Sequence, residues 1–90
     1  MAVNFKIVNQ RTKRGIHLNL TGDFDGTSAC ELLHAIRQLD RNKKPICINT
    51  DRLHNIYDFG CEVFRKNMVS VKNRSVKPVF QGRHRARLAS

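Results

Sequence analysis

One segment of this chain has the apolar spacing of an amphipathic helix, and this spacing constrains the fold more than any other feature. Its apolar residues recur three or four positions apart: Ala29, Leu32, Leu33, Ile36 and Leu39. This period places them on one helix face. Ser28 and Glu31 have the spacing of a capping box, which begins a helix. The sequence therefore predicts a helix over residues 28–42 that starts at Ser28.

Two segments before this helix alternate between apolar and polar residues, as half-buried strands do. The first covers residues 4–10 and the second residues 16–20, in which Ile16, Leu18 and Leu20 share one face. The connection between them ends in a glycine and has the length of a hairpin loop. We expect the two strands to form an antiparallel hairpin.

Three further elements are predicted after the helix. Residues 45–49 form a short apolar run, typical of a parallel strand that is buried on both faces, with Cys47 toward a core. Residues 50–57 are predicted as a loop, a second helix begins near Asp58, and residues 76–80 form a last strand. The order is therefore β-β-α-β-α-β in an α/β fold. Right-handed crossovers would make the last three strands parallel and complete a mixed four-stranded sheet.

The length of 90 residues, with 40% hydrophobic and 27% charged residues, fits one small globular domain. We expect this domain to span residues 1–81 and residues 82–90 to form a basic, flexible C-terminal tail.

Apolar runs stay short of the roughly 20 residues of a membrane-spanning helix, and the N-terminal segment lacks the apolar core of a secretory signal. Because no export signal is seen and the three cysteines are widely spaced, we expect reduced thiols in the cytoplasm. The short apolar runs predict no membrane contact.

The net charge of +10 is unevenly distributed along the chain. All seven acidic residues lie between Asp23 and Glu62, and residues 65–90 contain no acid. This asymmetry favours an anionic partner. One alternative function is therefore a basic nucleic-acid-binding module that uses the C-terminal cations Arg65, Lys66, Lys72, Arg74, Lys77, Arg83, Arg85 and Arg87. Against it, few aromatic residues lie near these cations and no nucleic-acid-binding signature is present.

Two acidic segments, residues 22–28 and 49–60, follow strands that we expect to be parallel neighbours. Both segments then lie at the same edge of the sheet, where open α/β sheets place ligand and partner sites. Three carboxylates at this edge could hold a divalent cation, but aspartate is routine in turns, so no metal or other cofactor is predicted. Asp58-Phe59-Gly60 matches the magnesium-binding tripeptide of protein kinases, yet the other kinase motifs are missing. Since no catalytic set of side chains can be defined, we expect no enzyme activity.

These two segments resemble the signature segments of STAS domains, the family named for sulfate transporters and anti-sigma factor antagonists. The first match covers residues 18–29, at Leu20, Gly22, Asp23, Phe24, Asp25 and Ala29. The second is at Ile56, Tyr57, Asp58, Phe59 and Gly60. The resemblance implies helices packed on one face of a mixed sheet and no chemistry in the domain itself. It also implies a bacterial signalling role through a protein partner such as an anti-sigma factor or a switch kinase.

The sequence departs from the family at the serine that antagonists phosphorylate, because that position holds Asp58. A carboxylate carries one negative charge, against about −1.5 to −2 for phosphoserine. Two interpretations stay open: Asp58 fixes a phosphorylated-like state, or it only caps the second helix and the switch is absent. Gly22 and Gly60 are expected to be structural, with Gly60 allowing the helix to approach the sheet closely.

The function we expect is a non-enzymatic STAS-like regulatory module that binds a protein partner. The expected contact residues lie along the shared edge: Asp23, Asp25, Thr27, Ser28, Arg52, His54, Tyr57, Asp58 and Phe59. Tyr57 and Phe59 would anchor the partner, because buried aromatic residues dominate interface energetics. Asp25 and Asp58 would match a basic pocket on the partner.

Overall fold

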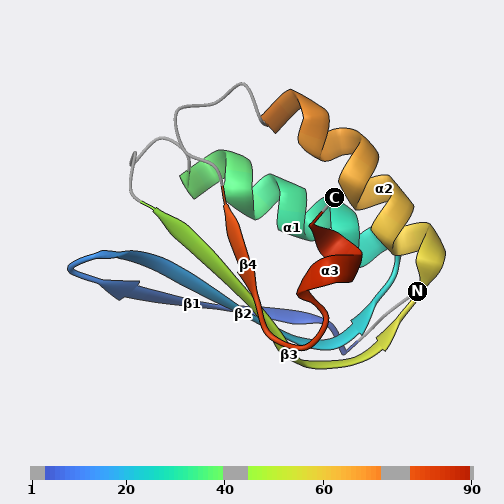
Figure 1. Cartoon of the computed structure of the whole chain (residues 1–90), viewed down its shortest axis with the longest axis horizontal. Helices are drawn as coiled ribbons and strands as arrows, with labels where there is room; N and C mark the ends of the chain where they lie inside the picture. The colour runs from blue at the N-terminus through green and yellow to red at the C-terminus, as the bar shows by residue number, and fades with distance from the viewer. Residues whose placement is uncertain (1–3, 40–44, 72–77, 90) are drawn as a thin grey trace.

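The structure, a computed structural model of the chain, describes residues 4–39, 45–71 and 78–89, with the backbone only for residues 69–71. Its elements follow in the order β1 (Lys6–Thr12), β2 (Gly15–Phe24), α1 (Gly26–Leu39), β3 (Ile46–Ile56), α2 (Asp58–Val71), β4 (Val79–Gln81) and α3 (Arg85–Leu88) (Figure 1). The predicted order β-β-α-β-α-β is confirmed, and α3 is an addition to it.

The four strands form one mixed sheet in the order β1-β2-β3-β4. β1 and β2 are an antiparallel hairpin, whereas β2 with β3 and β3 with β4 pair in parallel. α1 and α2 lie next to each other on one side of this sheet, and the short α3 lies against α2 and β4 (Figure 1). The α/β class, the mixed sheet and the one-sided helices agree with the sequence prediction.

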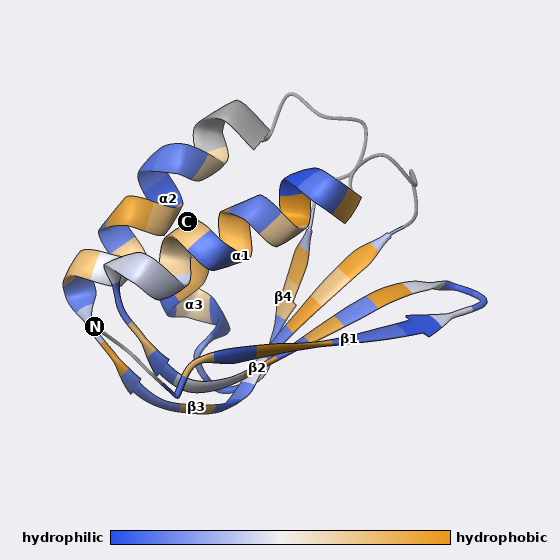
Figure 2. Cartoon of the chain, turned by 180° about the vertical axis from the view of Figure 1, so that it is seen from behind, coloured by the Kyte–Doolittle hydropathy of each residue, from blue (hydrophilic) through white to orange (hydrophobic). Residues whose placement is uncertain are grey.

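The core lies between the two long helices and the middle strands. In β2, Ile16, Leu18, Leu20 and Phe24 are buried and alternate with half-buried polar residues, as predicted for the first three. Figure 2 shows this division, because the tip of the β1–β2 hairpin is hydrophilic while hydrophobic residues run along the elements that enclose the core. Phe64 of α2 is fully buried and makes edge-to-face contacts with two rings, Phe24 at 6.1 Å and Phe80 at 5.6 Å between centroids.

The start of α1 differs from the prediction. The helix begins at Gly26, two residues earlier than expected, and Ser28 is not its N-terminal cap. The carbonyl of Asp25 accepts the helical hydrogen bond from Ala29, and its carboxylate accepts one from the amide of Ser28. Asp25 is thus the cap, since aspartate satisfies free helix amides as well as serine does. The predicted end beyond Leu39 lies outside the described residues.

The third strand is longer and more exposed than predicted. β3 continues to Ile56, so the loop expected over residues 50–57 is wrong. Its second half pairs with the end of β2 through two irregularities in register. Burial on both faces is also wrong: Ile46 and Ile48 are buried but Cys47 between them is half-exposed, because both long helices cover the same side of the sheet.

The C-terminal segment is folded where the sequence indicated a frayed tail. Arg85–Leu88 forms α3, and Leu88 is 1% exposed and belongs to the core. The backbone amide of His84 donates to Thr50 Oγ1 at 3.1 Å, and that of Arg83 donates to Asp51 Oδ1 at 2.7 Å. The segment is therefore attached to β3 by hydrogen bonds and to the core by a side chain. Within the described ranges, no helix combines the length and the apolar character needed to cross a membrane.

Candidate functional site

The two acidic segments meet at one edge of the sheet, as the predicted crossovers require. The amide of Tyr57 donates to the carbonyl of Phe24 at 2.9 Å. Asn55 adds two hydrogen bonds to Asp23 Oδ1, from its amide at 3.2 Å and from its side chain at 3.0 Å. The ends of β2 and β3 are thereby joined just before α1 and α2 begin. We call the surface around these two helix starts, formed by the solvent-accessible residues within 23–28 and 57–59, the contact rim.

Asp25 organises the first half of the contact rim. Its Oδ1 accepts from the amide of Ser28 at 2.9 Å and lies 3.0 Å from the Ser28 hydroxyl, which is also 2.9 Å from the carbonyl oxygen of Asp23. Ser28 is 1% exposed, so its hydroxyl serves this turn and does not face solvent. Thr27, between them, is exposed on the first turn of α1.

Asp25→Ala is expected to lower the free energy of unfolding by about 1–2 kcal/mol, because the amide and hydroxyl of Ser28 lose their shared acceptor. Urea denaturation of the purified variant measures this loss. Thr27→Ala is the matched control, since it changes an exposed neighbour in the same turn and should stay within about 0.5 kcal/mol of the original chain. Equal stability of the two variants would contradict the capping role of Asp25.

Gly60 brings the start of α2 against the start of α1. A Cβ atom at this position would lie 2.7 Å from the carbonyl carbon and oxygen of Asp25, which are backbone atoms that cannot move aside alone. The close approach predicted for this glycine is confirmed, but the neighbour is the backbone that enters α1 and not a strand interior. Only a residue without a side chain lets the two helix starts meet this closely.

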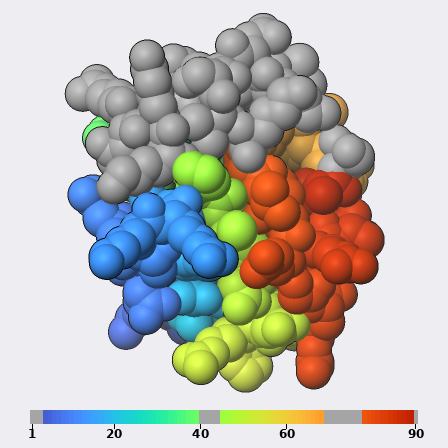
Figure 3. All heavy atoms as spheres, turned by 60° about the vertical axis from the view of Figure 1, so that its left-hand side comes forward, coloured from blue at the N-terminus to red at the C-terminus, as the bar shows by residue number. Residues whose placement is uncertain are grey.

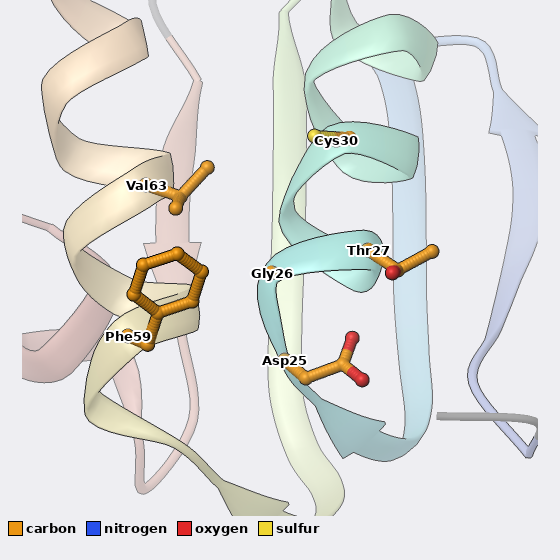
Figure 4. A pocket seen from close by; sticks show the side chains of 6 residues that line it. All are labelled: Asp25, Gly26, Thr27, Cys30, Phe59 and Val63. Carbon is orange, nitrogen blue, oxygen red and sulfur yellow. The ribbon is translucent and has the colours of Figure 1, made fainter. Parts of the chain in front are cut away.

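A shallow open groove lies where the two helix starts meet. It is lined mainly by apolar atoms of Asp25, Gly26, Thr27, Cys30, Phe59 and Val63. Figure 4 shows Phe59 and Val63 projecting from α2 toward α1, with the Cys30 sulfur on the facing side of α1. The sequence interpretation included Phe59 but missed Cys30 and Val63. Both follow a rim residue by one helical turn, Gly26 to Cys30 and Phe59 to Val63, and this four-residue spacing is the signal that identifies them.

The two predicted anchors of the contact rim are exposed. The Phe59 side chain is 69% exposed and Tyr57 is 51% exposed, the two largest aromatic exposures among the described residues. Both rings lie at the start of α2, two residues apart. Exposed aromatic rings that are neighbours on a small domain are typical of interaction surfaces.

Asp58 is the first residue of α2, and its carboxylate is paired with a residue far along the chain. Arg87 Nη2 of α3 donates to Asp58 Oδ1 at 2.6 Å. The Asp58 side chain is 95% exposed, so water and salt screen the pair and it contributes little to stability. The negative charge also suits the N-terminal end of the helix dipole. Sequence reasoning missed Arg87 as the partner, because it assigned that residue to a free tail.

Cys61 lies beneath this corner, buried in the core. Burial raises the pKa of its thiol, because the thiolate would lose hydration, while the nearby Arg87 and Arg65 lower it less and Asp58 adds to the rise. The thiol therefore stays protonated near neutral pH and acts as a packing group. Within the described part of the chain, no three His, Cys, Asp or Glu side chains gather into a group that could hold a metal ion.

Two further predicted contact residues lie on a strand and not at the helix starts. Arg52 and His54 are exposed on β3. Arg52 pairs in register with Thr21 and lines a hollow on the sheet face away from the helices. The structure thus brings Asp23, Asp25, Tyr57, Asp58 and Phe59 together but directs Arg52 to another surface.

The cations of the alternative nucleic-acid set are divided. Arg65 Nη1 donates to the carbonyl of Arg87 at 2.6 Å, and Arg87 is paired with Asp58, so these two cations serve internal contacts. Arg83, Arg85 and Lys66 are exposed. The other predicted members lie outside the described residues: Lys72, Arg74 and Lys77.

Comparison with known proteins gives a fold and no family. No family model matches the chain, and no curated protein matches it. A solved structure described as "Crystal Structure Analysis of Mglu" is similar over 87% of this chain, with a TM-score of 0.71 and 19% sequence identity. The chain spans 20% of that protein. At this identity the likeness extends to the fold alone.

Proposed function

We propose that this chain is a non-enzymatic, STAS-like regulatory module that binds a protein partner through the contact rim, in the manner of an anti-sigma factor antagonist in the bacterial cytoplasm. The observation that carries the proposal is the exposure of Phe59 and Tyr57 at two helix starts held together by backbone contacts. Rigid presentation matters, because a preformed surface loses little conformational entropy when a partner binds.

The chemistry of the contact rim supports a partner with an apolar anchor site beside basic groups. Phe59 and Val63 provide apolar surface next to the exposed carboxylate of Asp58. A cationic partner side chain would compete with Arg87 for that carboxylate. Asp58 would then be neither a permanently available charge nor only a helix cap. A partner would have to displace Arg87 to form an ion pair with its carboxylate.

Phe59→Ala is expected to weaken partner binding about 30-fold, the equivalent of a 2 kcal/mol interface anchor. The affinity-tagged chain would be used to capture its partner from native lysate. The captured partner would then be titrated against the original chain and the variant by calorimetry. The fold should persist, since the ring is mostly exposed and leaves no cavity.

Lys66→Ala is the matched control for this experiment. Lys66 is exposed on the same helix and lies outside the contact rim, so its truncation should change the affinity less than twofold, within about 0.4 kcal/mol. Circular dichroism and thermal unfolding would verify that both variants are folded. Equal affinity of Phe59→Ala and the original chain would refute the contact rim as the binding surface.

A further inference from the structure

The face of the sheet away from α1 and α2 carries mostly polar side chains in cross-strand rows. The middle row consists of Val8, Asn19, Asn49 and Gln81, which are register partners across all four strands. Beside it, Lys6 and Arg52 flank Thr21 in the next row. We call this surface the open sheet face. Figure 3 shows its strands side by side, with β1 and β2 in blue to cyan, β3 in lime and β4 in orange.

The open sheet face is hollowed and lined mainly by hydrogen-bonding groups, with Val8 as the apolar member of the lining. Val8, Gln10, Asn19, Thr21, Asn49 and Arg52 surround the hollow. Asparagine and glutamine amides each offer both donors and an acceptor, so a set of them matches the edges of nucleobases. Arg52 supplies the fixed fork of donors that phosphate oxygens bind best.

The charges around the open sheet face are cationic at both ends. Lys6 and Arg52 lie at one end, and Lys13 and Arg14 are exposed at the hairpin tip at the other. Two carboxylates lie beside this face, and both already accept hydrogen bonds. Asp23 accepts two from Asn55, one from its backbone amide and one from its side chain, and Asp51 accepts one from the backbone amide of Arg83. The whole chain carries a net charge of +10, which adds long-range attraction for a polyanion.

The dimensions of the open sheet face select among polyanions. Four strands spaced about 4.8 Å apart are wider than the roughly 12 Å major groove of duplex DNA, which admits a helix or a two-stranded ribbon. The seven residues of β1 extend over about 23 Å, long enough to follow several nucleotides of a flexible strand. A single strand can lay its bases on the amide side chains of the middle row, Asn19, Asn49 and Gln81, which we call the amide row. Its phosphates would then lie toward the cations at either end.

We propose that the open sheet face binds single-stranded nucleic acid, with Arg52 and Lys6 on phosphates and the amide row on base edges. This site is separate from the contact rim and uses none of its residues. It also differs from the C-terminal cation set considered from the sequence, two members of which are occupied by internal contacts.

The test is fluorescence anisotropy with a labelled oligouridine of about 12 nucleotides, within the known range of single-strand site sizes. An oligothymidine and a duplex of the same length are measured in parallel, at salt concentrations between about 50 and 200 mM. Arg52→Ala should bind about fivefold more weakly at roughly 0.1 M salt, because each phosphate contact on a single strand contributes about 0.7 to the salt slope. The slope of log affinity against log salt concentration should also become shallower by about 0.7 in this variant.

Asn49→Asp is the second variant and tests the amide row. The new carboxylate can keep the hydrogen bond that Asn49 Oδ1 accepts from the amide of Asp51 at 2.9 Å, so the fold is preserved. Its negative charge beside the bound strand should weaken binding at least as much as Arg52→Ala does. Lys66→Ala and Arg85→Ala remove exposed cations from α2 and α3 and should change the affinity less than twofold.

Four results would each overturn the proposal. The first is no binding at the lowest salt concentration, and the second is a duplex that binds as tightly as the single strand. The third is polyglutamate that displaces the labelled oligonucleotide as well as unlabelled single strand does. The fourth is a loss of affinity in the α2 and α3 variants as large as that of Arg52→Ala. The last result would move the site to the C-terminal cations. Binding of oligouridine but not oligothymidine, or of both, supports the proposal and identifies the sugar preference. None of these results affects the partner-binding proposal, whose readout is protein capture.

Discussion

Gly22→Ala is expected to lower the free energy of unfolding by about 3 kcal/mol. This is a large fraction of the total stability of a small domain. Gly22 has φ of +88°, a conformation in which an alanine is strained by roughly 1–3 kcal/mol. Its Cβ would also lie 2.3 Å from the carbonyl oxygen of Asn4, where the chain enters β1. Relieving that clash moves the backbone next to the buried Phe5 and costs about 1–3 kcal/mol more.

The measurement is the midpoint of urea denaturation, with Gly26→Ala as the matched control. A Cβ at Gly26 would meet the far end of the Phe59 ring at 2.9 Å, and an exposed ring can rotate away. Gly26 also begins a helix, where alanine is favoured over glycine by about 1 kcal/mol or less. We therefore expect Gly26→Ala to be close to neutral. If the two variants unfold at the same urea concentration, the crossing of Asn4 over Gly22 is wrong.

The sequence was sufficient to predict the architecture because its periodicities are local. The alternation of Ile16, Leu18 and Leu20 and the helical spacing of Leu32 and Ile36 each determine one element without reference to the rest. The handedness of crossovers then places the ends of β2 and β3 at one edge. For this reason the joining of the two acidic segments could be predicted, and the hydrogen bond from Tyr57 to Phe24 confirms it.

Features that depend on non-local pairing could not be predicted in this way. Residues 50–56 have the polar composition of a loop, yet hydrogen bonds to the end of β2 make them a strand. Irregularities in that pairing also change which side of the sheet a residue faces, because a shift of one residue reverses every side chain beyond it. Such a shift cannot be read from the sequence. For this reason Arg52 was wrongly expected to lie on the same surface as Tyr57 and Phe59.

The two proposed surfaces lie in different layers of the molecule. The contact rim is formed where the two helices begin, whereas the open sheet face is on the side of the strands that the helices do not cover (Figure 1). Neither proposed site uses a residue of the other, so each can be altered by a variant of its own. If both proposals hold, the domain can connect a protein partner to a nucleic-acid strand, and each activity can be removed separately, through Phe59 or through Arg52.

Leu88→Ala is expected to lower the free energy of unfolding by about 3 kcal/mol, within the range measured for fully buried leucines. Leu88 is 1% exposed although it is two residues from the end of the chain, and it belongs to the same core as Phe64. The sequence around it is strongly basic, so one leucine gives no periodic signal of burial. Its position depends on distant acceptors, Thr50 and Asp51, and on Arg65, which donates to the carbonyl of the preceding residue.

Arg85→Ala in the same short helix distinguishes packing from helix formation. Arg85 is exposed, so its truncation should change the free energy of unfolding by less than about 0.5 kcal/mol. Limited proteolysis gives an independent readout, because loss of Leu88 should expose the arginine-rich C-terminal segment to trypsin well below the unfolding temperature. A Leu88→Ala chain as stable and as resistant to trypsin as Arg85→Ala would mean that the segment is a free tail. Asp58 would then lose Arg87 as a partner, and its exposed charge would be available at all times.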